Sequence, residues 1–557
     1  MRESILRHLP GALFLILAVL AASQRVGASL PPEASSLAGP ELRINTFELG
    51  DQRVPLVAGN ADGRSVVIWQ SRDQDGPGWA IYAQRFDASL EPQGGEFLVN
   101  GYNIGSQDGQ SVAMAADGSF AVAWNGQDQA SETDVVSVRR FAPDGAPLAA
   151  DRRISETNGE IQLLPRLGLD ANDELLISWE ENTSASGFEI RSRRAGATGT
   201  PADPIRTVNV SSAGAQRRAD LAMAPDGSAV VVWQDAVLDG SDWGVFLRCL
   251  DAQGLGPAES QVNQTSIGQQ SRPRVALADD GRFAVVWQDT LGRSSFEYRR
   301  IMVRRFGADC QALGPERQVN AFDEGIQDQP AIAADRAGGY ILVWQSFPDD
   351  FQQQGIYARR LGRSGEFLSD EFRVNIELEA FQDFPDVSVM PDDGYLFVWE
   401  SAGQDESGFG IFARRFAGPL AAELRVVAGA GQSAQVGEVF AQNLIVEVID
   451  QWGQPRAGEP VRLRAPAAGA SAVFSNGLNE ITAASDAQGR VEFEMQANDR
   501  AGRFQLTIET VQGDEQSSVE LENIGLPSAA PIPVPATSPW SVFALMLLIS
   551  VLVRSRV

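Results

Sequence analysis

The residues best suited to chemistry in this sequence are carboxylates that follow a recurrent short apolar run. They cluster in five places, as Asp73 with Asp75, Asp128 with Asp134, Asp239 with Asp242, Asp349 with Asp350, and Asp405 with Glu406. Oxygen-only clusters of this kind suit calcium, although no stretch has the full ligand spacing of an EF-hand. We therefore expect either a solvated acidic rim or a calcium site, whose candidate ligands are Asp73, Asp75, Asp239, Asp242, Asp349 and Asp350.

Four aromatic side chains close the same acidic stretches, namely Trp79, Phe188, Trp243 and Phe409. An aromatic face beside carboxylates suits sugar binding, because the ring stacks on the sugar while the oxygens accept from its hydroxyls. The alternative is that these rings cover the edges of sheets. The sequence thus gives a candidate binding surface for a glycan or a protein ligand.

Other kinds of chemistry are excluded by what the exported chain lacks. The only His, His8, lies within residues 1–28, where an Arg-bearing start, an apolar run and the small residues at 26–28 predict a cleaved signal peptide. Histidine-dependent triads and imidazole metal sites are therefore ruled out. The 73 acidic residues exceed the 45 basic ones, giving a net charge of -28, which argues against a nucleic-acid partner. No catalytic motif remains, so we expect a protein that is not an enzyme.

A repeat of 54 to 57 residues positions these side chains, and its marker is a Trp at the end of a short apolar run. The seven copies are Trp69, Trp124, Trp179, Trp233, Trp287, Trp344 and Trp399. A fixed period in this range is typical of repeat architectures. Each copy contains four short strand-like runs, and an Asp-Gly pair such as Asp62-Gly63 predicts a hairpin between the first two.

The Trp-ending run is apolar on both faces, as in Phe120, Val122 and Trp124 against Ala121 and Ala123. This pattern indicates a strand buried between two sheets. The sequence therefore predicts an all-β fold with a seven-bladed β-propeller over residues 41–423, and a string of separate sandwiches is the alternative. An extra copy of the fourth run, 41–45, is expected to complete the last blade, although 422–426 competes for that place.

A Gln stands three residues before the first run of every copy, as Gln52, Gln107, Gln162, Gln216, Gln270, Gln327 and Gln382. A ring of seven amides could bind a ligand. The repetition is better explained if each Gln ties its crossover to the neighbouring blade by hydrogen bonds.

Three further sets of residues carry expectations. Arg166, Asp220, Arg274 and Asp386 share one position of the first run, and we expect them to line a channel mouth. Arg pairs on the third run, such as Arg139-Arg140, should form ion pairs with carboxylates of neighbouring blades. Cys249 and Cys310 lie one repeat apart, and an oxidising compartment would allow a disulfide between them; unpaired, partly buried thiols are the alternative.

Two resemblances describe the body of the chain. Stretches such as Gly355-Ile356-Tyr357-Ala358-Arg359-Arg360 resemble a propeller-like repeat of bacterial surface proteins. Residues 424–523 resemble the bacterial Ig-like domain (group 1) of the invasin and intimin type, through Val436-Gly437, the alternating run 444–448, and the turns at 450–455 and 486–490. The alternation also predicts a small β-sandwich. In that family such domains are rigid spacers, which is what the resemblance implies here.

The tail, 524–557, combines a Pro-rich stretch, an apolar run shorter than the roughly 20 residues of a membrane span, and two closing Arg. The segment 535–540 resembles the IPTL-type C-terminal sorting signals of Gram-negative bacteria. This resemblance implies membrane attachment before cleavage by an exosortase-like enzyme. A short uncleaved membrane tail is the alternative.

These features together predict an exported, non-catalytic binding or adhesion protein of the Gram-negative cell envelope, with a propeller head on an Ig-like spacer. One alternative is an extracellular hydrolase or lyase that acts on polysaccharide through paired carboxylates. A purely structural surface protein is the other.

Overall fold

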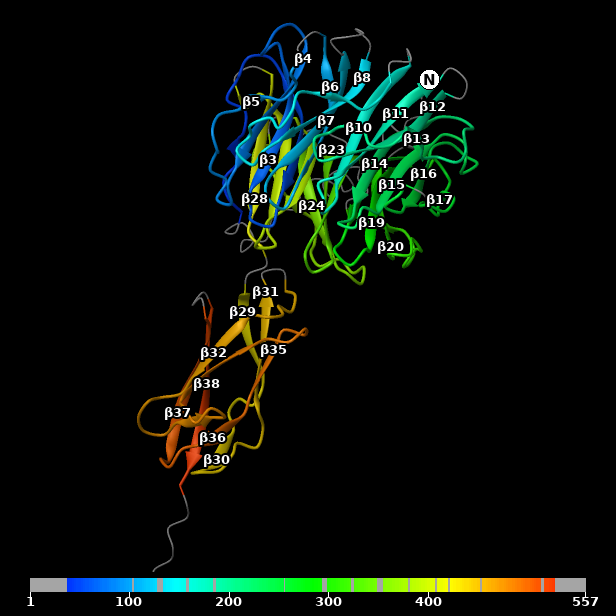
Figure 1. Ribbon diagram of the computed structural model, residues 1–557. Helices are drawn as coiled ribbons and strands as arrows, with labels where there is room; N and C mark the ends of the chain where they lie inside the picture. The colour runs from blue at the N-terminus through cyan, green and yellow to red at the C-terminus, as the bar shows by residue number, and fades with distance from the viewer. Residues whose placement is uncertain are drawn as a thin grey trace, which may run out of the picture. The chain divides into compact units, whose positions relative to one another are not determined.

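The computed structural model describes residues 38–525, except for 103–104, 128–133, 157–159, 184–186, 255, 293–297, 322–324, 348–353, 379–380, 406–407, 419–420, 451–452 and 512–514. Every regular element in these residues is a β-strand (Figure 1). The strands divide into two compact units between residues 420 and 421.

The first unit consists of four-stranded antiparallel sheets, which we number 1 to 7 in chain order. Sheet 1 contains β2 (Gln52–Gly59), β3 (Ser65–Arg72), β4 (Trp79–Phe86) and β5 (Phe97–Leu98); sheet 2 contains β6 (Gln107–Met114), β7 (Phe120–Gln127), β8 (Asp134–Phe141) and β9 (Arg152–Arg153); sheet 3 contains β10 (Ile161–Leu169), β11 (Leu175–Thr183), β12 (Gly187–Ala195) and β13 (Arg206–Thr207). Sheet 4 contains β14 (Gln216–Met223), β15 (Ala229–Asp235), β16 (Gly244–Leu250) and β17 (Ser260–Gln261); sheet 5 contains β18 (Gln270–Leu277), β19 (Phe283–Asp289), β20 (Arg300–Phe306) and β21 (Arg317–Gln318). Sheet 6 contains β22 (Ile326–Ala334), β23 (Tyr340–Phe347), β24 (Gly355–Leu361) and β25 (Phe372–Arg373); sheet 7 contains β26 (Gln382–Val389), β27 (Tyr395–Ala402), β28 (Phe409–Phe416) and, from the start of the chain, β1 (Leu42–Arg43).

The sheets stack in a closed cycle because the second strand of each is buried on both faces. Each hydrophobic cluster of this unit draws its residues from two neighbouring sheets, and one of them joins sheet 7 to sheet 1, with Val398 and Leu396 packed against Val67 and Trp69. Figure 1 shows this closure, where β28 (yellow-green) lies beside β3 (blue). The seven repeat Trp are between 0 and 2 % exposed, so they pack the seams between sheets.

The start of the chain completes the last sheet. In β1, Leu42 pairs with Ala413 and Arg43 with Phe412 of β28, as we expected for the extra fourth run. The competing segment lies in β29 (Ala421–Ala428), which pairs with β31 (Leu444–Asp450) of the second unit.

The Arg pairs of the third strands also join neighbouring sheets, but their partners differ from our prediction. The first member donates from Nη1 to a carbonyl oxygen of the preceding sheet, at 2.8 Å from Arg139 to Val99 and 2.7 Å from Arg304 to Val262. The second member faces the following sheet, as when Arg140 donates to the carbonyl of Asp173 at 3.1 Å and, as we expected, forms an ion pair with the Asp173 carboxylate at 3.4 Å. The prediction of carboxylate partners was wrong for the first members, because the two-residue outer strands leave backbone carbonyls that a guanidinium can satisfy.

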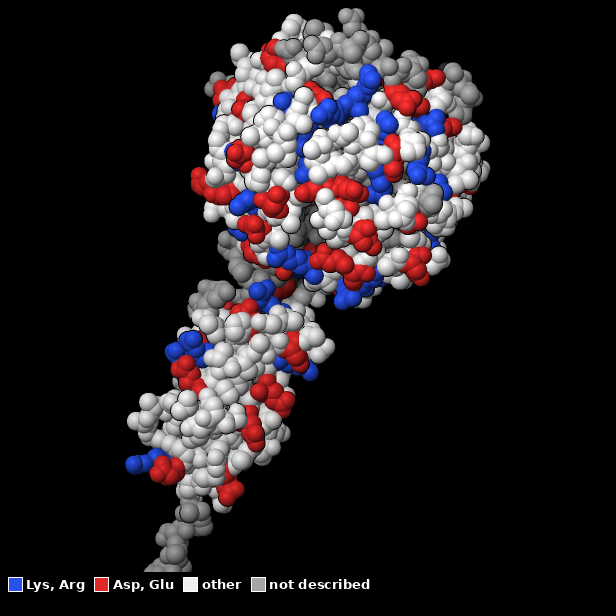
Figure 2. All heavy atoms as spheres, in the orientation of Figure 1, with Lys and Arg blue, Asp and Glu red and all other residues white. Residues whose placement is uncertain are grey.

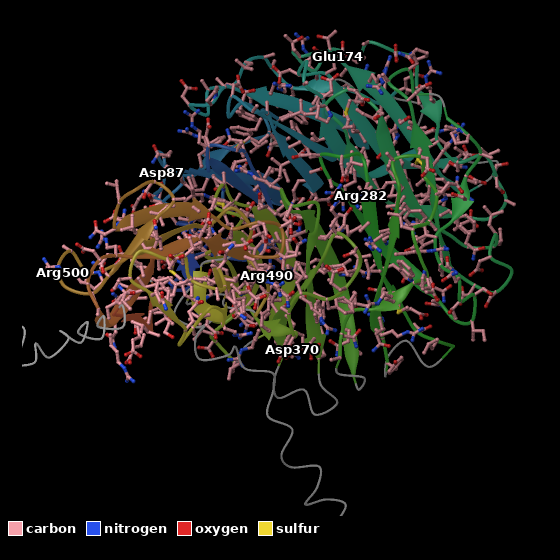
Figure 3. The ribbon with its side chains drawn as sticks, turned by 90° about the horizontal axis from the view of Figure 1, so that it is seen from below. Asp87, Glu174, Arg282, Asp370, Arg490 and Arg500 are labelled. Atoms are coloured by element: carbon pink, nitrogen blue, oxygen red, sulfur yellow. A yellow bond between two sulfur atoms is a disulfide. The ribbon has the colours of Figure 1, made fainter. Side chains whose placement is uncertain are left out.

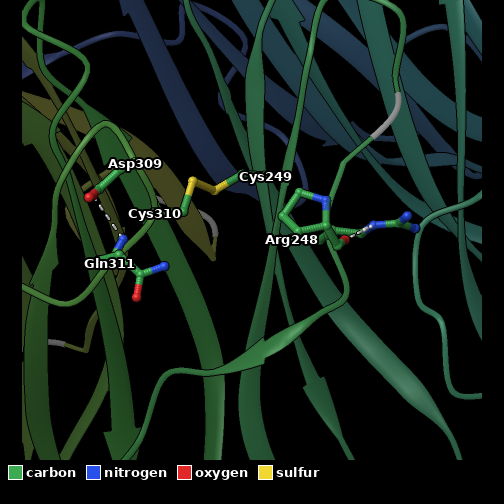
Figure 4. The surroundings of a disulfide bond; sticks show 6 residues. Arg248, Cys249, Asp309, Cys310 and Gln311 are labelled. Carbon is green, nitrogen blue, oxygen red and sulfur yellow. Dashed lines mark hydrogen bonds between the residues drawn. A yellow bond between two sulfur atoms is a disulfide. The ribbon is translucent and has the colours of Figure 1, made fainter.

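A disulfide links two neighbouring sheets. Cys249 in β16 is bonded to Cys310, which lies in the turn after β20, with a Cα–Cα distance of 6.6 Å (Figure 4). The turn that presents Cys310 is closed by Asp309, whose Oδ1 accepts from the Gln311 amide at 3.1 Å.

The second unit packs two sheets around one hydrophobic cluster. One sheet contains β29, β31 and β35 (Arg490–Phe493); the other contains β30 (Ser433–Gln435), β38 (Gln516–Ile524), β37 (Gly502–Thr510), β32 (Pro460–Arg464) and β34 (Glu480–Ala484), and β33 (Ala472–Phe474) pairs with β36 (Met495–Ala497). Phe504, Leu506 and Ile508 of β37 point into the cluster, while the residues between them lie outside it. In the part of the chain that the structure describes, no helix has the length and apolar character to cross a bilayer.

Candidate active site at the mouth of the ring

A cavity of about 310 Å³ lies where the first strands of the seven sheets begin. It is lined by residues of β2, β6, β10, β14, β18, β22 and β26, so all seven sheets surround it. This end of each first strand is also where the chain enters from the preceding sheet. The other face of the ring carries the hairpins between first and second strands, among them those of Glu174 and Arg282 (Figure 3).

In every first strand, the second residue after the repeated Gln has a left-handed backbone conformation. These residues are Val54, Gly109, Leu164, Arg218, Arg272, Gln329 and Phe384, with φ between 48° and 63°. Each lies within the register shift of its strand, and each lines the cavity. Because this conformation costs a non-glycine residue of order 1 kcal/mol or more, its repetition requires a compensating contact in each sheet.

That contact comes from the residue after the repeat Trp, which accepts a hydrogen bond from the left-handed residue of the next sheet. Glu400 Oε2 accepts from the Val54 amide at 2.7 Å, and Gln234 Oε1 accepts from the Arg272 amide at 3.0 Å. Asn125 accepts from Leu164, Glu180 from Arg218 and Gln345 from Phe384 in the same way. In these five seams the polar residue that follows the Trp therefore sets the backbone that faces the cavity, whereas the Gln329 amide donates to Asp328 Oδ1 of its own strand at 2.6 Å.

Two residues further along, a charged layer forms the floor of the cavity. Asp220 lies between two arginines, at 3.3 Å from Arg166 and 3.6 Å from Arg274. Asp386 of sheet 7 occupies the equivalent position and accepts from the Val57 amide at 2.9 Å. Burial raises the pKa of Asp386 to about 6, and the charge of Arg274 opposes this rise. Of the four residues that we expected to line a channel mouth, Arg166 and Arg274 line the cavity, whereas Asp220, which contacts both arginines, and Asp386 do not.

Asp108 is the carboxylate that lines the mouth of the cavity. It is half-buried, and its Oδ1 accepts from the amide nitrogen of Asn125 in the same sheet. Burial raises the pKa of Asp108, and the nearby charge of Asp134 adds to the effect. A carboxyl group at this position can take part in proton transfer or nucleophilic attack on a molecule bound in the cavity.

A second carboxyl pair lies in the seam between sheets 7 and 1. Glu400 is fully buried and bonds Arg53 Nη2 at 2.6 Å, while Asp383 is its partner across the ladder. Burial and the Glu400 charge raise the pKa of Asp383 to about 7. Because neither carboxylate lines the cavity, we assign this pair to the seam.

The four aromatic candidates lie away from the cavity, at the ends of loops that meet the following sheet. The Arg217 guanidinium is 4.1 Å from the Phe188 ring, and that of Arg53 is 4.1 Å from the Phe409 ring. The carbonyl of Trp243 accepts from the Gln270 amide at 2.7 Å. Trp79 is half-buried at the start of β4 beside Arg72. All four therefore contact protein at the seams.

The acidic loop residues are held by their own loops where the structure describes them. Asp73 accepts from the Gly78 amide at 2.9 Å, Asp239 from the Ser241 amide at 3.0 Å and Asp242 from Gln269 at 2.8 Å. Burial raises the pKa of Asp75. No group of three metal-ligating side chains occurs among the described residues. Asp128, Asp349, Asp350 and Glu406 lie outside those residues.

The seven repeated Gln side chains are buried in the crossovers. Gln107, Gln327 and Gln382 accept from the Trp indole of their own sheet, at 3.1, 3.0 and 2.7 Å. Gln52, Gln216 and Gln270 accept from an Asn of the incoming crossover, and Gln162 donates to the Glu156 carbonyl. Their amides thus bind the protein itself.

Sequence reasoning did not find Asp108 or the left-handed residues. The signal that was available is a Pro directly after the left-handed position, at Pro55, Pro165, Pro273, Pro330 and Pro385. Pro recurring inside a strand indicates an interruption of its ladder. On the face shown in Figure 2, acidic and basic side chains are interspersed, so the net charge by itself does not point to the cavity.

Among known proteins, the similarity of this chain is to solved structures. No protein-family model matches the chain, and no curated protein matches it. Among solved structures it is similar to a Dyadobacter fermentans protein of unknown function (11% identity, 68% of this chain and 98% of that one, TM-score 0.43). Others are a Penicillium chrysogenum α-L-arabinanase (14%, 55% and 92%, TM-score 0.38) and a Ruminococcus gnavus intramolecular trans-sialidase (10%, 67% and 96%, TM-score 0.39). The all-β fold of four-stranded antiparallel sheets is shown by the strand pairing of the chain itself.

Our prediction of a non-catalytic binding or adhesion protein is corrected at this point. The two similar structures above that have a named activity are an arabinanase and an intramolecular trans-sialidase, and neither is an adhesin. The prediction failed because it took the absence of a sequence motif as the absence of a site. In a ring of sheets, catalytic carboxylates come from separate repeats and leave no local motif.

Proposed function

We propose that this protein is an exported enzyme that cleaves polysaccharide, with its active site in the cavity at the mouth of a seven-bladed β-propeller. The observation that carries the proposal is the meeting of Asp108 with the arginines of three other sheets around one cavity. The cyclic packing of the seven sheets supports the propeller assignment.

Glycoside cleavage needs two carboxyl groups with different protonation. Asp386, in the floor layer, carries a pKa of about 6 and is suited to donate a proton to the leaving oxygen. Asp108, at the mouth, is suited to serve as the base or nucleophile once it is ionised. Asp108 lines the cavity, and Asp386 lies in the adjacent charged layer, where the charge of Arg274 acts on its carboxyl group.

The rest of the chain fits an envelope enzyme. We propose that the second unit is an Ig-like spacer, supported by its two sheets around one core, and that residues 1–28 and 524–557 direct export and sorting. Calcium in the acidic loops stays a proposal, with Asp73, Asp75, Asp239 and Asp242 as the described ligands.

The test is turnover by the purified chain on a panel of arabinan, sialylated and uronate-containing oligosaccharides, read by reducing-end release. We expect Asp108→Asn and Asp386→Asn each to lower kcat by at least about 100-fold. Asp62→Asn, in an exposed hairpin on the other face, is the matched control and should be unchanged. Full turnover by both cavity variants, or no turnover of any substrate by the native chain, would contradict the proposal.

A further inference from the structure

The mouth of the cavity has two unlike halves. Of its left-handed residues, those of sheets 4 to 6 are polar, namely Arg218, Arg272 and Gln329. Those of the remaining sheets are Phe384, Val54, Gly109 and Leu164, which present apolar or no side chains. One side of the opening is therefore cationic and hydrogen-bonding, and the facing side is apolar.

The arginines of the floor and of the mouth differ in how their charge is balanced. In the floor, Asp220 contacts both Arg166 and Arg274. In the mouth, the contact recorded for the Arg272 side chain is with the neutral Gln329, and neither Arg218 nor Arg272 makes an ion pair with a carboxylate among the described residues.

The nearest carboxylate to Arg218 is already engaged. Glu180 is fully buried, bonds Arg217 Nε at 3.0 Å and accepts the backbone amide of Arg218. Burial and the adjacent charge of Arg272 lower the pKa of Arg218, which shows that the two like charges oppose each other. An anion placed between them would relieve this repulsion.

The backbone fixes where these two guanidinium groups emerge. Arg218 and Arg272 hold φ values of 54° and 52°, and Glu180 and Gln234 of the preceding sheets anchor their amides. Two adjacent guanidinium groups offer paired N–H donors, whose geometry matches that of a carboxylate.

We propose that Arg218 and Arg272 form a subsite for the carboxylate of an acidic sugar, whose ring lies against Phe384 and Leu164. This inference rests on the proposed function, since it names the substrate class of the same cavity. Gln329, which also lines the cavity and whose Oε1 accepts from Arg272, supplies its amide nitrogen for a sugar hydroxyl. A neutral sugar would leave the two arginines unpaired and should be bound less tightly.

The test uses the full chain carrying Asp108→Asn, so that binding is measured without turnover. The probes are trigalacturonate, glucuronate and N-acetylneuraminate, each compared with its methyl ester, together with a sulfated galactan trisaccharide, by isothermal titration calorimetry. We expect at least one acid to bind about ten- to a hundred-fold more tightly than its ester. Equal affinity for acid and ester, tighter binding of the sulfated probe than of every acid, or no binding of any acid would overturn the proposal.

Matched variants locate the subsite. Arg218→Gln and Arg272→Gln should each lower affinity for the acid about ten-fold or more and leave binding of the ester unchanged. Gln is suited to the left-handed position, because Gln329 occupies it in sheet 6 with φ 51°. Arg64→Gln, an exposed arginine of the opposite hairpin face, is the control and should bind as the parent does. Retained affinity in both cavity variants would refute the subsite. The native chain could cleave no substrate and still bind acids selectively, with both variants abolishing that binding. This outcome would support the subsite and contradict only the proposed enzymatic function.

Discussion

Asp383 gives the sharpest prediction about stability, because ionising its carboxyl group destabilises the folded chain. Burial and the neighbouring Glu400 raise its pKa from 3.8 to about 7. Asp383→Asn keeps the size of the side chain and an oxygen to accept from the Phe384 amide, which now bonds Asp383 Oδ1 at 2.9 Å. We therefore expect this variant to be more stable than the parent at pH 8.

The size of the stability gain in Asp383→Asn, and the pH range in which it occurs, follow from proton linkage. Between pH 3.8 and about 7 the unfolded chain has released this proton and the folded chain has kept it, so stability falls as the pH rises and the full cost applies above pH 7. A difference of about three pKa units corresponds to about 4 kcal/mol. Because the side chain is only half-buried and solvent screens it, we expect a gain of about 2 kcal/mol at pH 8. The gain should fall below about 1 kcal/mol at pH 5.

The assay is guanidinium unfolding followed by Trp fluorescence, which reports the buried Trp of the ring. Asp328, at the equivalent position of sheet 6, pairs with Arg299, so Asp328→Asn should instead destabilise the fold by about 1–3 kcal/mol. A loss of stability in Asp383→Asn at pH 8, or a gain that does not depend on pH, would refute the reasoning.

Three other outcomes can be checked by the same unfolding assay. Trp344→Phe should lower the free energy of unfolding by about 1 kcal/mol more than Trp233→Phe does. The reason is that the Trp344 indole donates to Gln327 at 3.0 Å, whereas the Trp233 indole nitrogen has no partner in the described residues. Equal losses would contradict this. Replacing both Cys249 and Cys310 with Ser should lower the free energy of unfolding by about 4 kcal/mol in the chain-entropy treatment of a 61-residue separation, and dithiothreitol should have no effect on that variant. Arg304→Ala should cost about 1–3 kcal/mol, since it leaves the buried Val262 carbonyl without its donor at 2.7 Å; a stability like that of Arg64→Ala would count against the seam role.

Much of the ring could be predicted from the sequence because its repeat is local. The spacing of the Trp, the Asp-Gly turns and the two-sided apolar runs each depend on a few adjacent residues, and the strands and their order follow from them. The extra run at 41–45 likewise marked the strand that completes sheet 7, because its residues repeat the fourth run of the other copies.

The site was harder to predict because its residues belong to different repeats. We did not predict the left-handed residue that interrupts each first strand. A one-residue interruption changes which side chains face the axis. The hydrogen-bond acceptor that stabilises it belongs to the preceding sheet, as when Gln345 Oε1 accepts from the Phe384 amide. The aromatic and acidic candidates were chosen by their place in loops, whereas Asp108 lies inside a strand.

The sequence by itself determined an all-β repeat protein whose single His is His8, and it marked the Trp as the residues that pack the sheets. Only the tertiary structure decided that Asp108, Arg218 and Arg272 line one cavity, because closing the cycle of sheets brings together residues that belong to different repeats. The physical reason is that local periodicity encodes each sheet, whereas the charges at the axis meet only after all seven sheets have packed.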